Sequence, residues 1–251
     1  MNNAMALRRI AAAALMAAAV GVAASAPAAH ADVDAVASAT ATEYRFGVFY
    51  GDRRIGEHNY EVVHDGAATR VSSRADFQVK ILFVTAYRYR HQANELWQDG
   101  CLTGLSSVTN DNGERYQVQA ERTEPGLRLT RMEPSRKEIS LDQPCPAGFA
   151  YWDRSRLDRD ALINAQTGEV SAGQLIEEGN ETIDGADTVR YRLQPEGLAP
   201  ITLWYRASDD LWVRLETRRD DNTLQYRLES VSQRSESAIE EDARVQDPPG
   251  I

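Results

Sequence analysis

The sequence predicts an all-β domain: a curved antiparallel sheet of about ten or eleven strands, a half-barrel or nearly closed barrel, around one short helix. Apolar and polar residues alternate through most of residues 43–231, and Gly, Asn, Asp and Pro turn signals interrupt the alternation. A helical period is convincing in one place only, between Ala150 and Ala165. An antiparallel sheet this long must curl or hide its edges, and a two-sheet sandwich is the alternative arrangement.

The domain is predicted to open with a hairpin. Aromatic and apolar residues alternate over 44–50, Gly51-Asp52 turns the chain, and residues 55–63 return as the second strand. A third strand is expected over 71–79.

The most informative stretch is a long strand of period two over residues 87–97. One of its faces carries rings and polar tips: Tyr87, Tyr89, His91, Glu95 and Trp97. Flat apolar area with a few orienting hydrogen bonds suits a ligand groove, so these five are the predicted ligand-binding residues. The alternative is that both tyrosines pack in the core. Arg88 and Arg90, on the other face, are expected to pair with carboxylates across the sheet or with an acidic ligand.

The next hairpin is predicted from Asn110-Asp111-Asn112-Gly113, which joins strands over 102–109 and 116–122. The single helix is then expected between Ala150 and Ala165, with Asp153 or Ser155 as its cap. This helix would plug the curved sheet or cap one end of it.

Strands resume after Val170 with regular turn chemistry. The turn signals are Asp184-Gly185, Pro195-Glu196-Gly197, Ser208-Asp209-Asp210 and Asp220-Asp221-Asn222. Alternating apolar residues between them favour a meander that continues to residue 231.

The N-terminus predicts export, and both ends of the chain are expected to lie outside the β domain. Arg8-Arg9, an uncharged run to Ala24 and Ala29-His30-Ala31 form a signal peptide over 1–31, followed by a linker over 32–42. Residues 232–251 are polar and acidic and are expected to form a disordered tail. The predicted localisation is periplasmic or secreted, with no membrane-spanning segment after signal cleavage.

Charge excludes one class of partner. Residues 1–31 hold two of the 28 basic residues and none of the 38 acidic ones, which leaves 26 against 38 and a net charge of −12. Such a surface repels nucleic acid, so none is expected as a partner.

The two cysteines, Cys101 and Cys145, both follow the signal peptide. An even number in an oxidising compartment predicts a disulfide. A redox pair or a pair of metal thiolates is the alternative, although the spacing is not C-x-x-C and no histidine lies close to either cysteine.

Motifs for catalysis and cofactors are missing from the sequence. It has no G-x-S-x-G elbow, H-E-x-x-H, P-loop or dinucleotide fingerprint. His58, His64 and His91 would have to converge over long range to bind a metal. No catalytic residue, metal site or cofactor is therefore predicted.

Several segments resemble a family of exported proteobacterial proteins known as a domain of unknown function. The resemblance is carried by Val79-Lys80-Ile81-Leu82-Phe83, Tyr87-Arg88-Tyr89-Arg90-His91, Glu95-Leu96-Trp97, Gly100-Cys101-Leu102 and Thr109-Asn110-Asp111-Asn112-Gly113, and it covers roughly residues 43–230. The layout is also loosely similar to periplasmic lipoprotein-carrier-like half-barrels, which implies an incomplete barrel open to apolar ligands. The family implies no reaction, because fold does not determine function.

Three hypotheses stay open at this point. The first is a non-catalytic periplasmic protein that binds an apolar or amphipathic small molecule. The second is an envelope assembly or protein-interaction module with an envelope protein as its partner, and the third is a hydrolase that uses a carboxylate or His91.

Overall fold

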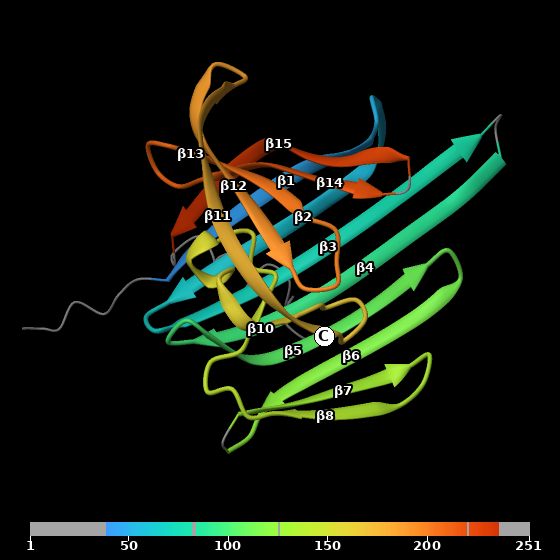
Figure 1. The fold of residues 1–251 in the computed structure, drawn as a ribbon, viewed down its shortest axis with the longest axis vertical. Helices are drawn as coiled ribbons and strands as arrows, with labels where there is room; N and C mark the ends of the chain where they lie inside the picture. Colours follow the sequence, from blue (N-terminus) through green and yellow to red (C-terminus); the bar gives the residue numbers. More distant parts are fainter. Residues whose placement is uncertain (1–38, 82–83, 125, 220, 236–251) are drawn as a thin grey trace, which may run out of the picture. The chain divides into compact units, whose positions relative to one another are not determined.

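The computed structural model describes residues 39–81, 84–124, 126–219 and 221–235, which form one sheet of 15 strands (Figure 1). The first half of the chain supplies β1 (Thr40–Tyr50), β2 (Arg53–Asp65), β3 (Ala68–Ile81), β4 (Val84–Gln98), β5 (Cys101–Asp111), β6 (Glu114–Arg122), β7 (Leu127–Glu133) and β8 (Lys137–Leu141). The second half supplies β9 (Ala147–Gly148), the 3-10 helix η1 (Arg154–Arg156), β10 (Arg159–Ile163), β11 (Val170–Ile183), β12 (Ala186–Pro195), β13 (Ile201–Arg206), β14 (Trp212–Arg219) and β15 (Asn222–Ser235).

The strand order is β8-β7-β6-β5-β4-β3-β2-β1-β15-β14-β13-β12-β11-β10-β9. Within each half, neighbours in the sheet are neighbours in the chain, and the halves join where β1 pairs antiparallel with β15. Of the described strand pairs, only that of β9 with β10 is parallel. Because β8 and β9 form two edges of the described sheet, the sheet curves without closing into a barrel.

Turn chemistry sets the hairpins as the sequence predicts. Asn112 and Gly113 adopt φ values of 53° and 99°, and Asp184 and Gly185 adopt 51° and 81°. Positive φ at both central residues gives the tight turn whose twist matches paired strands. These turns place β5 against β6 and β11 against β12.

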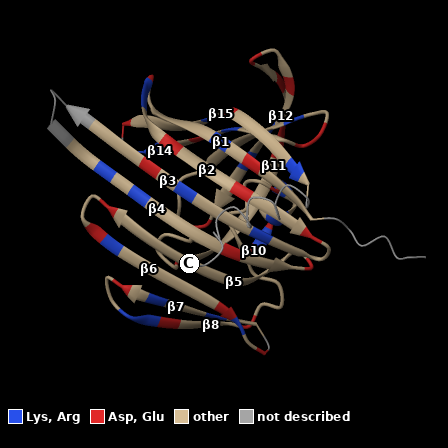
Figure 2. Cartoon of the chain, turned by 180° about the vertical axis from the view of Figure 1, so that it is seen from behind, with Lys and Arg blue, Asp and Glu red and all other residues tan. Residues whose placement is uncertain are grey.

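The segment from β9 to the start of β11 lies on one face of strands β2–β5, here called the inner face. It stands in front of them in Figure 1 and behind them in Figure 2. The Leu102 N–H donates to the Pro146 carbonyl (2.9 Å), and the Ser107 hydroxyl donates to the Ala165 carbonyl. The predicted disulfide is present between Cys101 and Cys145 and ties the chain just before this segment to the start of β5.

The core fills the space between this segment and the inner face. Its fully enclosed side chains include Phe46, Trp97, Leu157, Tyr205 and Trp212. Phe46 and Trp212 come from opposite halves of the chain and have ring centroids 4.1 Å apart. Burial of these rings therefore holds the two halves together across the β1–β15 pair.

The all-β fold class is confirmed, but the helix expected between Ala150 and Ala165 is wrong. Asp153 does cap a helix, as predicted, yet that helix is the three-residue turn η1. The following Ala161-Leu162-Ile163 is a buried part of β10 instead. An apolar run this short fits a buried strand as well as a helix, and pairing with β9 and β11 decides for the strand.

The strand count and the boundaries also differ from the prediction. The described ranges hold 15 strands rather than ten or eleven, because short strands such as β9 and β10 lack enough residues to show a period. The strand β1 begins at Thr40, inside the expected linker, and β15 ends at Ser235, inside the expected tail. The predicted signal peptide, most of the linker and most of the tail lie outside the described residues. Among those described, no helix has the length and apolar character needed to cross a bilayer.

Candidate functional site

The predicted ligand-binding residues all belong to β4. Alternation turns Tyr87, Tyr89, His91, Glu95 and Trp97 to the inner face, together with the buried Ala93. The other residues between them are exposed on the opposite face: Arg88, Arg90, Gln92, Asn94 and Leu96. On that outer face, Arg90 pairs with Asp76 of β3 (3.3 Å), which confirms the expected cross-strand ion pair.

Two adjoining cavities lie on the inner face. The larger, here called the wide chamber, has a volume of about 390 Å³, and the smaller, the narrow chamber, about 200 Å³. Tyr89 and Gln166 line both. Tyr87 lines the wide chamber, and His91 and Glu95 line the narrow one. Four of the five predicted residues therefore meet at one place.

Trp97 is the exception, because it lines neither chamber. Its side chain is fully buried, with its ring centroid 5.8 Å from that of Trp152 and the Arg156 guanidinium 5.0 Å from its ring centroid. Its indole N–H donates to Glu95 Oε2 (2.8 Å). Trp97 thus belongs to the core and orients a carboxyl that faces the narrow chamber.

The wide chamber has an apolar wall and a polar side. Its wall includes Phe77, whose ring stacks on Tyr89 with centroids 5.1 Å apart. On the polar side, the Tyr87 hydroxyl donates to Asp111 Oδ1 (2.6 Å) and the Gln166 amide donates to Asp111 Oδ2 (3.2 Å). The Tyr89 hydroxyl donates to Gln166 Oε1 (3.1 Å), so the hydrogen bonds form a chain that fixes both tyrosines.

The narrow chamber brings together two histidines and Glu95. His58 Nδ1 lies 3.2 Å from the Tyr60 hydroxyl, and His91 Nδ1 lies 2.8 Å from Thr109 Oγ1. The two imidazole centroids are 6.4 Å apart. In the described part of the chain, His58 Nε2 is buried and has no hydrogen-bond partner.

Burial controls the charge of this chamber. It lowers the pKa of His58 well below its ordinary value, assisted by His91, and lowers the pKa of His91 to about 4. It also raises the pKa of Glu95 to about 7, against the opposing effects of the Trp97 N–H and Arg156. At neutral pH both imidazoles are therefore uncharged, and Glu95 is protonated in a large share of the molecules.

The three described histidines do not converge on one point. His64 bonds to Thr69 Oγ1 (3.1 Å) and lines neither chamber. Across the described ranges, no three His, Cys, Asp or Glu side chains lie close enough together to hold a metal ion.

Sequence reasoning missed several lining residues. Tyr226 follows the period-two pattern of β15 and could have been assigned to the inner face, although not to a chamber. Gln166 lies in the connection between β10 and β11, where no period exists. His58 was visible only as a histidine on a predicted strand, because its unpartnered nitrogen depends on the packing around it.

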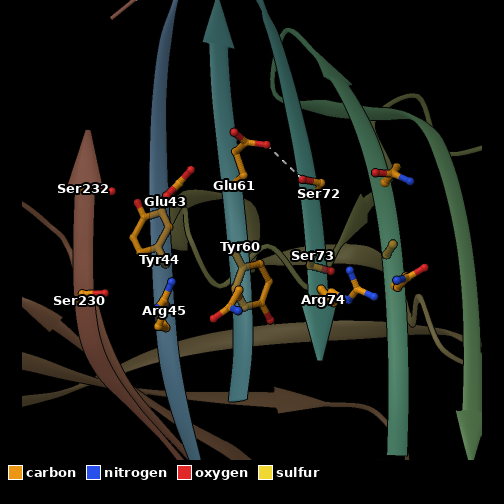
Figure 3. A pocket seen from close by; sticks show the side chains of 14 residues that line it. Glu43, Tyr44, Arg45, Tyr60, Glu61, Ser72, Ser73, Arg74, Ser230 and Ser232 are labelled. Carbon is orange, nitrogen blue, oxygen red and sulfur yellow. Dashed lines mark hydrogen bonds between the residues drawn. The ribbon is translucent and has the colours of Figure 1, made fainter. Parts of the chain in front are cut away.

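A third hollow, here called the outer groove, crosses the opposite face of β15 and β1–β4 (Figure 3). It has a volume of about 590 Å³ and is lined by polar side chains such as Arg45, Asn59 and Arg74. The Ser72 hydroxyl donates to Glu61 Oε2 (3.4 Å), as drawn in Figure 3. Most of the residues that line the outer groove are polar or charged, so it offers an apolar ligand a poorer site than the wide chamber does.

The chain belongs to the family described as a domain of unknown function, DUF6134, whose model matches residues 46–229. Among solved structures, it is similar to a β-barrel-like protein of the domain of unknown function DUF1849 from Brucella abortus. The TM-score is 0.55 at 10% identity, over 78% of this chain and 97% of that one. It also matches a domain named for outer membrane lipoprotein sorting, from Vibrio parahaemolyticus, with a TM-score of 0.30 at 12% identity over 82% of this chain and 88% of that one. No curated protein matches the sequence. At 10% identity, the similarity to the Brucella abortus protein shows a shared fold alone. The similarity to the Vibrio parahaemolyticus domain, with its TM-score of 0.30, is too weak to support a conclusion.

Proposed function

We propose that this protein is a non-catalytic periplasmic binding protein that holds an apolar or amphipathic small molecule in the wide and narrow chambers. The observation that carries the proposal is the meeting of the two chambers at Tyr89 and Gln166. One chamber supplies an aromatic wall, and the other supplies a buried imidazole nitrogen without a partner.

The size and chemistry of the chambers support this function. Ligand pockets are typically concavities of about 300–1,000 Å³ with apolar walls and a few placed polar groups. The wide chamber, at about 390 Å³, falls in this range and is walled by Tyr50, Ile55, Phe77, Leu224 and Tyr226.

Two features support an exported protein. The Cys101–Cys145 disulfide is typical of an oxidising compartment. The first 31 residues have the charged start, apolar run and A-x-A end of a secretory signal.

Native mass spectrometry of the mature protein, purified gently from its own periplasm, tests the proposal. We expect a stoichiometric apolar adduct on the wild-type protein. Leu224→Trp places a large ring in the wall of the wide chamber and should reduce the occupied fraction at least tenfold. Arg74→Trp places the same ring in the outer groove and should leave the adduct unchanged.

The proposal is wrong if the wild-type protein, with its disulfide intact, has a bare mass and takes up no species from a lipid extract. It is also wrong if Leu224→Trp and Arg74→Trp, both folded by circular dichroism, carry the adduct equally.

A further inference from the structure

Resting on the proposed function, we infer that the buried end of the ligand is an uncharged oxygen group, a carbonyl or a hydroxyl, which hydrogen-bonds His58 Nε2 in the narrow chamber. The apolar body of the same ligand then occupies the wide chamber. This assigns His58 as the residue that selects the head group.

The first reason is the unpartnered nitrogen. His58 is 8% exposed, lines the narrow chamber, and has a buried Nε2 with no partner within the described residues. Buried polar atoms in native proteins are nearly always hydrogen-bonded, and leaving one unpaired is destabilising. A ligand group in the chamber supplies the missing partner.

The second reason is that the other imidazole nitrogen, Nδ1, already has a hydrogen-bond partner. The Tyr60 hydroxyl lies 3.2 Å from His58 Nδ1, so one of the two donates to the other. If the hydroxyl donates, Nε2 carries the proton and needs an acceptor such as a carbonyl or hydroxyl oxygen. If Nδ1 donates, Nε2 is an acceptor and needs a hydroxyl. In either tautomer, Nε2 can form a hydrogen bond with an uncharged oxygen group.

The third reason is the absence of counter-ions. No Lys or Arg lines the narrow chamber in the described structure, and burial keeps both imidazoles uncharged at neutral pH. A ligand carboxylate or phosphate would therefore lie beside Glu95 with no cation among the lining residues. Arg156, whose charge acts on Glu95, already pairs with Asp153 (2.6 Å), so burial of the anion is costly.

A cationic head group is disfavoured for a related reason. Among the described residues, Glu95 is the only carboxyl that lines the narrow chamber, and its Oε2 already accepts from the Trp97 indole. The positive charge of Arg156 acts on the same carboxyl. A second cation would have to share this carboxyl while repelling Arg156.

The test is isothermal titration calorimetry of the delipidated mature protein at pH 8 with four probes of one chain length. These are decan-1-ol, decan-2-one, decanoate and decyltrimethylammonium. We expect the two neutral probes to bind at least tenfold more tightly than either ion. His58→Phe keeps the ring but removes both nitrogens, and it should weaken binding of the neutral probes about tenfold.

His64→Phe is the matched control, because it makes the same change on the same strand outside the chambers. It should leave all four affinities unchanged. The inference is overturned, and the proposed function stands, if an ion binds as tightly as the neutral probes or if folded His58→Phe binds them as well as wild type does. If none of the probes binds the wild-type protein, the proposed function fails as well.

Discussion

The inner and outer faces of β1–β4 are built from alternate residues of the same strands, yet they differ in almost every physical respect. The inner face gathers rings and mostly uncharged polar groups around two chambers of about 390 and 200 Å³, with Asp111 and Arg219 as charged members of the wide one. The outer face carries Arg, Glu, Asn and Ser around a groove of about 590 Å³ (Figures 2 and 3). A larger hollow is therefore not a better candidate site, because lining chemistry matters more than volume.

The difference between the faces arises from hydration. On the outer face, water stabilises charged groups, so pairs such as Arg90–Asp76 add little to stability. On the inner face, water is largely excluded, and a group remains charged there only at a cost. The same side chain thus has a different effect one residue further along a strand.

The largest change in stability that separates the two faces is expected from two neighbouring residues of β4. Trp97 is 0% exposed and Leu96 is 40% exposed. We expect Trp97→Ala to reduce the free energy of unfolding by about 3–5 kcal/mol, because it removes a ring packed against Trp152 and Arg156. Leu96→Ala should change it by less than about 0.5 kcal/mol. Urea unfolding measures both, and equal losses would contradict the assignment of the faces.

A smaller effect is expected from the pH dependence of Glu95. Because burial raises its pKa from 4.5 to about 7, the folded protein binds this proton more tightly than the unfolded chain does. The stabilisation is complete below pH 4.5 and is lost as the pH rises through 7. Between pH 4.5 and pH 8, the free energy of unfolding of Glu95→Gln should therefore rise by about 3 kcal/mol relative to that of the wild-type protein.

The matched control for that experiment is Glu61→Gln, on the outer face of β2, where the Glu61 side chain is 42% exposed. As an exposed substitution, it should change the free energy of unfolding by less than about 1 kcal/mol. A flat difference for Glu95→Gln, indistinguishable from this control, would show that Glu95 is hydrated like an outer residue. His58 and His91 titrate in all three proteins, so their contributions cancel.

The smallest expected effect is on the outer face itself. Arg234 of β15 pairs with Glu43 of β1 and with Glu61 of β2 (3.1 Å to the latter). We expect Arg234→Ala to cost about 0.2–1 kcal/mol in low salt and nothing measurable in about 1 M NaCl, because exposed ion pairs are screened. Thermal unfolding at the two salt concentrations measures this loss, and a loss that salt does not reduce would mean that the pair is effectively buried.

Much of the sheet could be predicted because its information is local. The alternation of β4 assigned each of its residues to a face, and Asn112-Gly113 specified a hairpin through its positive φ angles. The segment after Ala150 was misread because four or five apolar residues suit a strand or a helix, and strands distant in sequence decide between them. Only the part of the site that comes from one strand could be predicted, again because that information is local. The β4 residues follow a period, whereas Gln166 reaches the chambers through the fold of the whole chain.

The strand order has a consequence for how the chain becomes a folded domain. The first and last strands, β1 and β15, pair in the interior of the sheet, while its two edges, β8 and β9, follow each other in the chain. Each half can assemble from local hairpins, but the pairing of Thr40 with Ser235 requires the complete polypeptide and a large loop closure. A product truncated before Asn222 would leave Thr40–Tyr50 as an open strand edge, which makes incomplete chains prone to self-association.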